Sequence, residues 1–442
     1  MSANFNCIIM GAAGRDFHDF QTFFRRNPRF RVCAFTATQI PFIESRVFPR
    51  SLAGPDYESD IPILPEQQLA DLIRQYDVDF VFLAYSDLPH RDVMHKASLV
   101  QACGAGFVLL GPRATQLKSR KPVISVTAVR TGAGKSPLTQ HLARFLTDSG
   151  RTAGIIRHPM PYGDLSRQRV ERIATLADLD RFECTIEERE EYRPYVQQGL
   201  TIYAGVDYAE ILAAAEADAD VVLWDGGNND FSFVRPGLSI VVADALRAGH
   251  ELNYYPGETS FRSADVLVIS KVTEATDENI RLIRSHAEQF NPRAEIIEAD
   301  LEIDVSDPAA IADRRVLVVE DGPTVTHGGM SFGAGTLAAR KFGAAELVDP
   351  RPYAVRSIAE AFNNYPHLKQ VLPALGYSPR QRDELRETIN AAGADVVVDA
   401  SPAGLEDLLE LTIPVVRVRY RFRQISGSRI EDLVEQYLSS TN

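Results

Sequence analysis

Short apolar runs alternate with amphipathic stretches along most of the chain. This alternation is typical of α/β proteins, in which helices cover a mostly parallel sheet. Strands are predicted over 6–10, 31–37, 79–85, 106–110, 123–129, 151–156, 220–224, 238–242, 265–269, 294–297, 315–319, 395–398 and 415–420. Helices are predicted over 15–26, 138–147, 354–362 and 380–391. We therefore expect an α/β fold.

Turn formers divide the 442-residue chain into three parts. We predict a Rossmann-like domain over 1–115, a central catalytic domain with a mostly parallel sheet over 121–345, and a smaller C-terminal α/β region over 350–442. The polar linker 114–121 separates the first two parts, and two prolines open the third.

The first strand leads into a glycine turn, IMGAAGRD. Only Gly11 and Gly14 match a G-x-G-x-x-G register, and Thr36 and Thr38 stand where a ribose-binding carboxylate is expected. A tight turn between strand and helix is favoured over a dinucleotide site.

The segment TAVRTGAGKS, residues 127–136, lies between an apolar strand and an amphipathic helix, as in a P-loop. Backbone N–H groups of such a loop wrap phosphates, the lysine reaches the β- and γ-phosphates, and the hydroxyl ligates Mg²⁺. Val129 replaces the first consensus glycine. The predicted nucleotide-binding residues are Thr131, Gly132, Ala133, Gly134, Lys135 and Ser136.

Two later strand ends complete the predicted ATP site. Asp225 ends the run DVVLWD and is expected to hold Mg²⁺ together with Ser136. The string SKVT has Thr273 where a guanine-reading protein carries Asp, so ATP is favoured over GTP. Lys271 could still pack on the base.

Arg130 occupies the position where a subclass of dimeric P-loop proteins carries an extra lysine. This position favours a homodimer with Arg130 reaching across the interface. The alternative is that Arg130 pairs with a carboxylate of its own chain.

Three further strings are candidate anion-handling loops. RHPMPYGDL presents Arg157 and His158 beside stiffening prolines. CTIEEREEY reads by itself as a solvated helical charge run. EDGPTVTHGGMSFGAG is a glycine-rich turn whose amides can cradle a phosphate, although mobile turns of this composition are common.

Composition limits the partners. There are 47 Lys and Arg against 60 Asp and Glu, a net charge of −13, so general binding to nucleic acid or to anionic membranes is not expected. No apolar run approaches a membrane span, the start lacks a signal-peptide pattern, and the 4 cysteines form no C-x-x-C pair. We expect a cytoplasmic protein.

Several strings together resemble the cyclic 2,3-diphosphoglycerate synthetases. They are AVRTGAGKS, RHPMPYGDL, CTIEEREEY, YAGVDY, LWDGGNND, GHE with YYPGE, and EDGPTVTHGGM with FGAG, spread over about 127–343. The resemblance implies an enzyme that uses ATP and Mg²⁺ to close an intramolecular phosphoanhydride in 2,3-diphosphoglycerate, releasing ADP and phosphate.

Such chemistry needs positive charge around crowded oxyanions. The predicted catalytic residues are Lys135, Arg130, Arg157, His158 and His327. The predicted site for a small anionic phosphorylated substrate comprises Arg157, His158, Glu187, Glu188, Arg189, His327, Gly328 and Gly329. The alternatives are an ATP-dependent kinase or ligase that activates another small phosphorylated or carboxylated acid, and a nucleotide-switch or metallochaperone protein.

Overall fold

The computed structural model describes residues 4–12, 14–38, 46–158, 165–227, 230–320, 322–326, 330–375, 378–401, 404–405 and 409–441. The chain forms two compact units. The first comprises Met1–Ala174, Leu200–Ala299 and Gln424–Asn442, and the second comprises Thr175–Gly199 and Asp300–Arg423.

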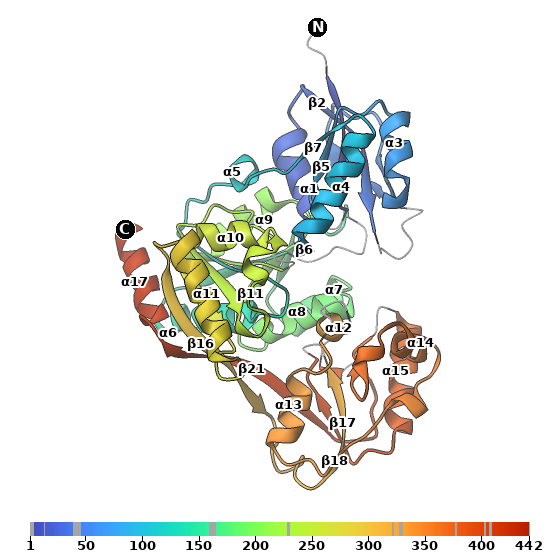
Figure 1. Ribbon diagram of the computed structural model, residues 1–442, viewed down its shortest axis with the longest axis vertical. Helices are drawn as coiled ribbons and strands as arrows, with labels where there is room; N and C mark the ends of the chain where they lie inside the picture. The colour runs from blue at the N-terminus through green and yellow to red at the C-terminus, as the bar shows by residue number, and fades with distance from the viewer. Residues whose placement is uncertain are drawn as a thin grey trace. The chain divides into compact units, whose positions relative to one another are not determined.

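The first unit begins with a six-stranded sheet in the order β3-β4-β2-β1-β5-β7, parallel except where β3 meets β4 (Figure 1). Its strands are β1 (Phe5–Met10), β2 (Phe30–Ala37), β3 (Val47–Phe48), β4 (Ile61–Pro65), β5 (Phe80–Leu83) and β7 (Gly106–Val108). Its helices are α1 (Arg15–Asp19), the π-helical turn η1 (Phe20–Phe24), α2 (Arg50–Ala53), α3 (Leu69–Gln75), α4 (His90–Ala102) and the short α5 (Pro112–Thr115).

Both faces of this sheet are buried, because successive residues of a strand point to opposite faces. Cys7 and Ile9 pack with the phenylalanines of α1 and η1. Ile8 and Met10 pack with α3 and α4 on the other face.

The first unit also contains the sheet that carries the P-loop, in the order β10-β11-β9-β12-β8-β13-β15-β16. Neighbours are parallel except β10 with β11. Its strands are β8 (Val123–Ala128), β9 (Ala153–Arg157), β10 (Glu171–Ile173), β11 (Thr201–Ala204), β12 (Val221–Asp225), β13 (Leu238–Asp244), β15 (Val266–Ser270) and β16 (Glu295–Val305). Its helices are α6 (Lys135–Asp148), α9 (Tyr208–Asp218), α10 (Gly257–Ser263), α11 (Asp277–Phe290) and α17 (Ile430–Thr441).

Contacts join the two sheets of the first unit. β6 (Leu88–Pro89), which follows β5, pairs with β14 (Tyr254–Tyr255) of the P-loop region. The apolar cluster around α1 includes Leu165 and Val206, which belong to the P-loop region. Residues of the N-terminal sheet are therefore packed against the P-loop region.

The second unit has a parallel sheet in the order β21-β20-β17-β18, with β19 also paired to β17. Its strands are β17 (Arg315–Glu320), β18 (Glu346–Leu347), β19 (Leu372–Pro373), β20 (Val396–Asp399) and β21 (Val415–Ser426). Its helices are α7 (Leu176–Arg181), α8 (Ile186–Val196), α12 (Gly322–Val325), α13 (Ala334–Lys341), α14 (Arg356–Asn364) and α15 (Pro379–Ala391). The chain passes between the units four times: before α7, after α8, within β16 and within β21.

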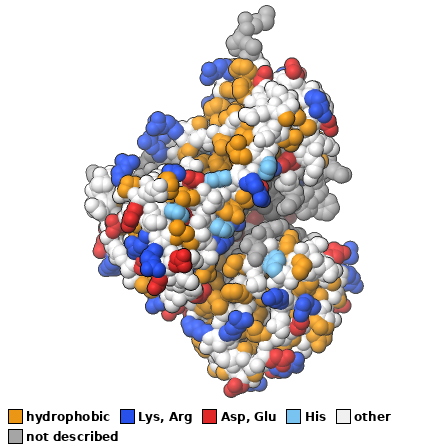
Figure 2. All heavy atoms as spheres, viewed as in Figure 1, with side chains coloured by type: hydrophobic (Ala, Val, Ile, Leu, Met, Phe, Trp, Pro, Cys, Tyr) orange, Lys and Arg blue, Asp and Glu red, His pale blue; other side chains and the backbone are white. Residues whose placement is uncertain are grey.

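The predicted α/β class with mostly parallel sheets is confirmed. Each predicted strand overlaps an observed one, but the predicted helix over 15–26 is divided into α1 and η1. Within the described ranges, no helix combines the length and the apolar character that crossing a bilayer requires. Basic and acidic side chains are interspersed on the face drawn in Figure 2, so an anionic ligand depends on a local site.

Candidate nucleotide site

The P-loop connects the buried strand β8 to helix α6. Gly132 has φ of +76° and Gly134 has φ of +109°, backbone conformations that side-chain-bearing residues rarely adopt. Lys135 is the first residue of α6 and is buried, with 7% exposure. No acidic residue occupies the first turn of α6, so its N–H groups face no carboxylate from that turn.

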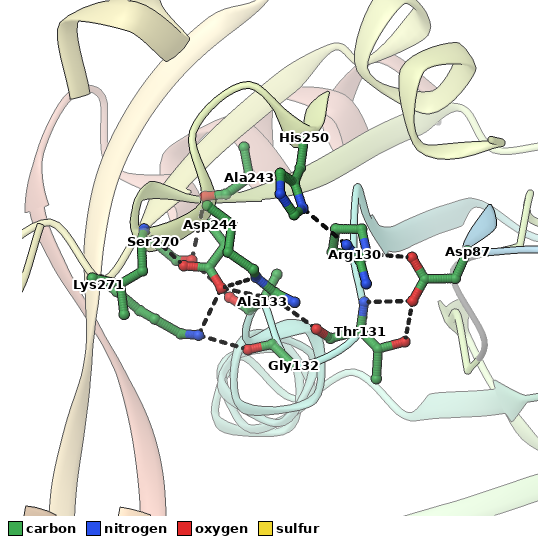
Figure 3. Close-up of polar contacts among 12 residues, drawn as sticks. Asp87, Arg130, Thr131, Gly132, Ala133, Ala243, Asp244, His250, Ser270 and Lys271 are labelled. Atoms are coloured by element: carbon green, nitrogen blue, oxygen red, sulfur yellow. Dashed lines mark hydrogen bonds and ion pairs between the residues drawn. The ribbon is translucent and has the colours of Figure 1, made fainter. Parts of the chain in front are cut away.

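Two side chains at the end of β15 hold carbonyl groups of this loop (Figure 3). Ser270 Oγ donates to the Ala133 carbonyl at 2.7 Å, and Lys271 Nζ donates to the Gly132 carbonyl at 2.8 Å. Lys271 Nζ also lies 2.8 Å from Asp244 Oδ2. These two hydrogen bonds fix the backbone carbonyls of the loop.

Asp244 is the carboxylate that orients the anchoring cations. Burial acts to raise its pKa, but Lys271 and Arg247 outweigh burial and hold the pKa of Asp244 below its usual value. Arg247 also donates to the Thr131 carbonyl at 2.6 Å. Lys271 thus contacts the loop backbone, and its packing on a base stays a prediction.

The tip of the loop is tied to the N-terminal sheet region of the same chain. Arg130 Nε lies 2.6 Å from Asp87 Oδ1, and Thr131 Oγ1 donates to Asp87 Oδ2 at 2.9 Å (Figure 3). The Arg130 guanidinium also lies 3.8 Å from the Tyr254 ring centroid and 2.9 Å from His250 Nδ1. Arg130 pairs within its own chain, as the alternative expected; the homodimer stays a prediction.

The two predicted Mg²⁺ ligands share one cationic neighbour. Asp225 ends β12, is fully buried and forms an ion pair with Arg157, which is its register partner at the end of β9. Arg157 Nη1 also donates to Ser136 Oγ at 3.2 Å, and Thr139 Oγ1 donates to Asp225 Oδ1 at 3.2 Å. A hydroxyl and a carboxylate are the hard oxygen donors that Mg²⁺ prefers beside nucleotide phosphates. The donor set therefore fits Mg²⁺, provided that Arg157 releases Asp225.

His158 follows Arg157 and turns into the interior. It is 2% exposed, and its Nδ1 lies 3.0 Å from Asp230 Oδ2. Its ring lies against Gly14, where a Cβ atom would come within 1.6 Å of Nε2. A side chain at position 14 would clash with this ring, which explains why the turn between β1 and α1 has a glycine there.

The remaining predicted substrate residues belong to the second unit or lie outside the described residues. Glu188 is buried and forms a capping box with Thr185 at the start of α8. Arg189 donates to the carbonyls of Cys184 and Leu179 and contacts Asp180 at 2.6 Å, so these two side chains bind the α7–α8 junction.

Several other predicted substrate residues lie outside the part of the chain that the structure describes. The Glu187 side chain lies outside the described part of the chain, as do His327, Gly328, Gly329 and the segment 159–164. No group of three His, Cys, Asp or Glu at metal-binding distances occurs among the side chains that are described.

Sequence reasoning missed Asp87, Asp244, Arg247 and the position of His250. His250 lies in the string GHE, which the family resemblance had singled out without a role. Asp87 had no local signal, because its partner Arg130 is 43 residues further along the chain and only folding joins them.

Comparison with known proteins gives one relationship over nearly the full length. No protein-family model matches the chain. The chain is 54% identical over 430 residues to the arginine synthetase ArcE of Thermococcus kodakarensis, and the match covers 97% of this chain and 96% of that protein. The cyclic 2,3-diphosphoglycerate synthetase assignment is not confirmed by this match.

Solved structures are more distant. LpxK from Aquifex aeolicus, crystallised with ATP, is 14% identical with a TM-score of 0.43, covering 79% of this chain and 94% of that chain. HypB from Archaeoglobus fulgidus is 19% identical with a TM-score of 0.26, covering 41% of this chain and 81% of that chain. It is the full-length sequence match that identifies the family: the chain belongs to the family of the arginine synthetase ArcE.

Proposed function

We propose that this protein is an ATP- and Mg²⁺-dependent synthetase that makes arginine. The observation that carries the proposal is the 54% identity to an arginine synthetase over nearly the whole of both chains. The geometry supports the ATP half of the reaction, because Lys135, Ser136, Asp225 and Arg157 gather where β8, β9 and β12 end. Ligands of parallel sheets bind at such carboxyl ends.

The chemistry of a guanidinium group suggests how ATP is used. A ureido amino acid such as citrulline lacks one nitrogen, and its ureido oxygen is a poor leaving group. Transfer of the γ-phosphoryl group to that oxygen makes it a good one, and an incoming nitrogen then displaces orthophosphate. The balanced products are arginine, ADP and phosphate.

The residues of the site suit this transfer. The P-loop N–H groups and Lys135 would hold the phosphates, and Mg²⁺ on Ser136 and Asp225 would neutralise charge on the phosphate oxygens. Arg157 would then leave Asp225 and bind the transferring phosphoryl group through its planar, two-pronged guanidinium. Positioning and electrostatic stabilisation account for most of phosphoryl-transfer catalysis.

A second candidate is the closure of cyclic 2,3-diphosphoglycerate, which the motif strings favour. This reaction would use the same two steps. ATP would first phosphorylate one phosphate of the substrate, and the other phosphate would then displace orthophosphate. The two candidates differ in the acceptor, and the acceptor provides the test.

The test incubates the purified protein with ATP, Mg²⁺ and either citrulline with ammonium chloride or 2,3-diphosphoglycerate. Arginine is measured by chromatography, and phosphorus NMR follows ADP, phosphate and any new pyrophosphate-type signal. We expect arginine and ADP in equal amounts, and none with Lys135→Ala. A cyclic product without arginine would establish the second candidate, and ADP release that ignores both acceptors would contradict both.

A further inference from the structure

The side chain of His250 lies against Arg130 at the tip of the P-loop (Figure 3). His250 opens the helical turn η5 (His250–Leu252), and its Nδ1 lies 2.9 Å from Arg130 Nη1. A guanidinium group has N–H donors and no acceptor, so His250 Nδ1 accepts this hydrogen bond. The imidazole is therefore neutral in this arrangement and carries its proton on Nε2.

The surroundings of His250 favour this neutral form. Burial lowers the pKa of His250 below its ordinary value, and the neighbouring cations Arg130 and Arg247 act in the same direction. Asp244 and Asp87 oppose them without reversing the shift. At neutral pH, His250 is thus an uncharged hydrogen-bond acceptor for Arg130.

A buried carboxylate fixes the turn that carries His250. Glu251 is 1% exposed, and its Oε2 accepts from the Gly249 N–H at 2.8 Å. Its Oε1 lies 2.5 Å from Nδ1 of His286, a residue of α11. Asn253 Nδ2 also donates to the Gly249 carbonyl at 2.6 Å. These contacts hold the backbone on both sides of His250, so the protein itself positions the imidazole.

Two other groups hold the Arg130 guanidinium. Its central carbon lies 3.8 Å from the centroid of the Tyr254 ring, and the His250 ring stacks on the same tyrosine with centroids 4.7 Å apart. Asp87 Oδ1 lies 2.6 Å from Arg130 Nε. Fixing an arginine side chain costs rotamer entropy, and these contacts impose that cost before a nucleotide binds.

The segment that carries Tyr254 is also packed on the backbone of the loop. A Cβ atom on Gly257 would lie 2.5 Å from the Val129 carbonyl oxygen, so a side chain would clash there. β14 pairs with β6, which begins directly after Asp87. The strings GHE and YYPGE, at 249–251 and 254–258, therefore meet the P-loop at Arg130.

These contacts leave one amino group of Arg130 unused. Asp87 faces Nε and His250 faces Nη1, and no residue in the described part of the chain accepts a hydrogen bond from Nη2. Arg130 directly precedes Thr131, the first residue of the predicted nucleotide-binding set. A guanidinium N–H group at this place in the loop can donate a charge-assisted hydrogen bond to a phosphate oxygen.

The charges at the tip of the loop favour an anionic ligand. Three cations accompany two carboxylates there, namely Arg130, Arg247 and Lys271 with Asp87 and Asp244. The neutral His250 adds a hydrogen-bond acceptor without reducing this excess of positive charge. A carboxylate at position 250 would also accept from Arg130, but it would cancel the excess.

We propose that His250 is the positioning residue of Arg130, and that it holds the guanidinium so that Nη2 donates to a phosphate oxygen of bound ATP. Arg130 is the group that touches ATP, and His250 acts only through Arg130. The neutral imidazole fixes the position of the guanidinium and leaves its charge available to the phosphate. The proposal rests on the ATP half of the proposed function and not on the identity of the phosphoryl acceptor.

The test measures the Kd for ATP by isothermal titration calorimetry, with Mg²⁺ and without a phosphoryl acceptor, in three variants of position 250. His250→Phe keeps the stacking on Tyr254 but has no hydrogen-bond acceptor, and its Kd should rise about tenfold. His250→Asn places Oδ1 near the position of Nδ1, and its Kd should stay within about threefold of the wild type. His250→Asp has the same shape with a negative charge, and its Kd should rise about tenfold.

A double variant tests whether His250 acts through Arg130. Arg130→Ala should weaken ATP binding, and adding His250→Phe to it should raise the Kd no further, because both changes remove the same contact. His95→Phe, at an exposed position of α4, is the matched control and should bind ATP like the wild type. Thermal unfolding checks that each variant folds, and the comparison of His250→Asn with His250→Asp still decides if His250→Phe does not.

Three results would each overturn the proposal. They are a wild-type Kd in His250→Phe, an equal loss in His250→Asn and His250→Phe, which would assign His250 a structural role only, and additive losses in the double variant. A wild type that binds no ATP would refute the proposed function and this proposal together. A wild type that binds ATP but forms no arginine would refute the proposed function and leave the role of His250 standing.

Discussion

Two glycine-containing connections of the protein, one from β8 to α6 and one from β17 past α12 to α13, treat anions differently. In the first unit, β8 leads into α6, whose first turn carries Lys135 and Ser136 and no acidic residue. In the second unit, β17 leads to α13, and Glu320 at the end of β17 accepts hydrogen bonds from the N–H groups there. These are the N–H groups of Gly333, Gly335 and Thr336, at 2.9, 3.1 and 2.8 Å.

The difference teaches that a glycine-rich turn does not by itself indicate a phosphate site. The amides at the start of α13 already hold an internal carboxylate, and Glu320 is only 2% exposed. Burial raises the pKa of Glu320, and the hydrogen bonds from Thr336, Gly335 and Gly333 act against that rise. The turn at α6 lacks such a carboxylate in its first turn, so a nucleotide can supply the anion.

The largest expected effect comes from Lys135→Ala, which removes the lysine ammonium group from the turn between β8 and α6. The rate of ATP turnover should fall at least about 100-fold, because phosphoryl transfer depends on positioned positive charge. Steady-state ADP release measures this, with circular dichroism to check the fold. Lys341→Ala, in the last turn of α13, is the control and should keep normal turnover. Near-normal turnover in Lys135→Ala would remove the P-loop assignment.

Asp225→Asn tests whether the Asp225 carboxylate binds the Mg²⁺ ion expected beside the P-loop. The Mg²⁺ concentration for half-maximal rate should rise about tenfold, because an amide oxygen neutralises less of the metal's charge than a carboxylate. Thr139→Val removes the 3.2 Å hydrogen bonds from Thr139 Oγ1 to Asp225 and to the Lys135 carbonyl but keeps the Asp225 carboxylate, so it should shift the titration less. An unchanged Mg²⁺ titration in Asp225→Asn would exclude Asp225 from the metal site.

Glu320→Ala should leave the N–H groups at the start of α13 without their acceptor. The free energy of unfolding should fall by about 3 kcal/mol, because several buried N–H groups lose their acceptor. Urea denaturation measures the loss, and added sulfate should restore part of it by binding at the freed helix start. The KM for ATP should stay unchanged. A variant as stable as the wild type would show that the internal carboxylate does not hold this turn.

Asp87→Asn gives the smallest effect. The variant keeps the side-chain shape but weakens the contacts to Arg130 and Thr131, so the loop is less well held before ATP binds. The KM for ATP should rise about threefold to tenfold with little change in kcat. Asp92→Asn, on the exposed side of α4, is the matched control. Equal KM values in both variants would mean that the N-terminal region does not organise the P-loop.

Local patterns were enough for the strands that were predicted and for the P-loop, although helices such as α3, α4, α9, α11 and α17 were not predicted. The strand that ends at Asp225 and the turn from β8 to α6 are each encoded within a dozen or so residues, because apolar alternation and glycine positions act on the nearby backbone. The helix over 15–26 was less well predicted, since its phenylalanines pack on the sheet as a short α-helix followed by a π-helical turn. Tertiary packing overrides local propensity at such a place.

The sequence by itself determined the α/β class, the P-loop and the strand-end carboxylate at Asp225, and comparison over its full length determined the family. Only the tertiary structure decided which charges meet. It paired Arg130 with Asp87, filled the start of α13 with Glu320, and buried Arg15 with His158 and Asp230. The physical reason is that electrostatic energy depends on distance and burial, and neither can be read from positions far apart along a chain.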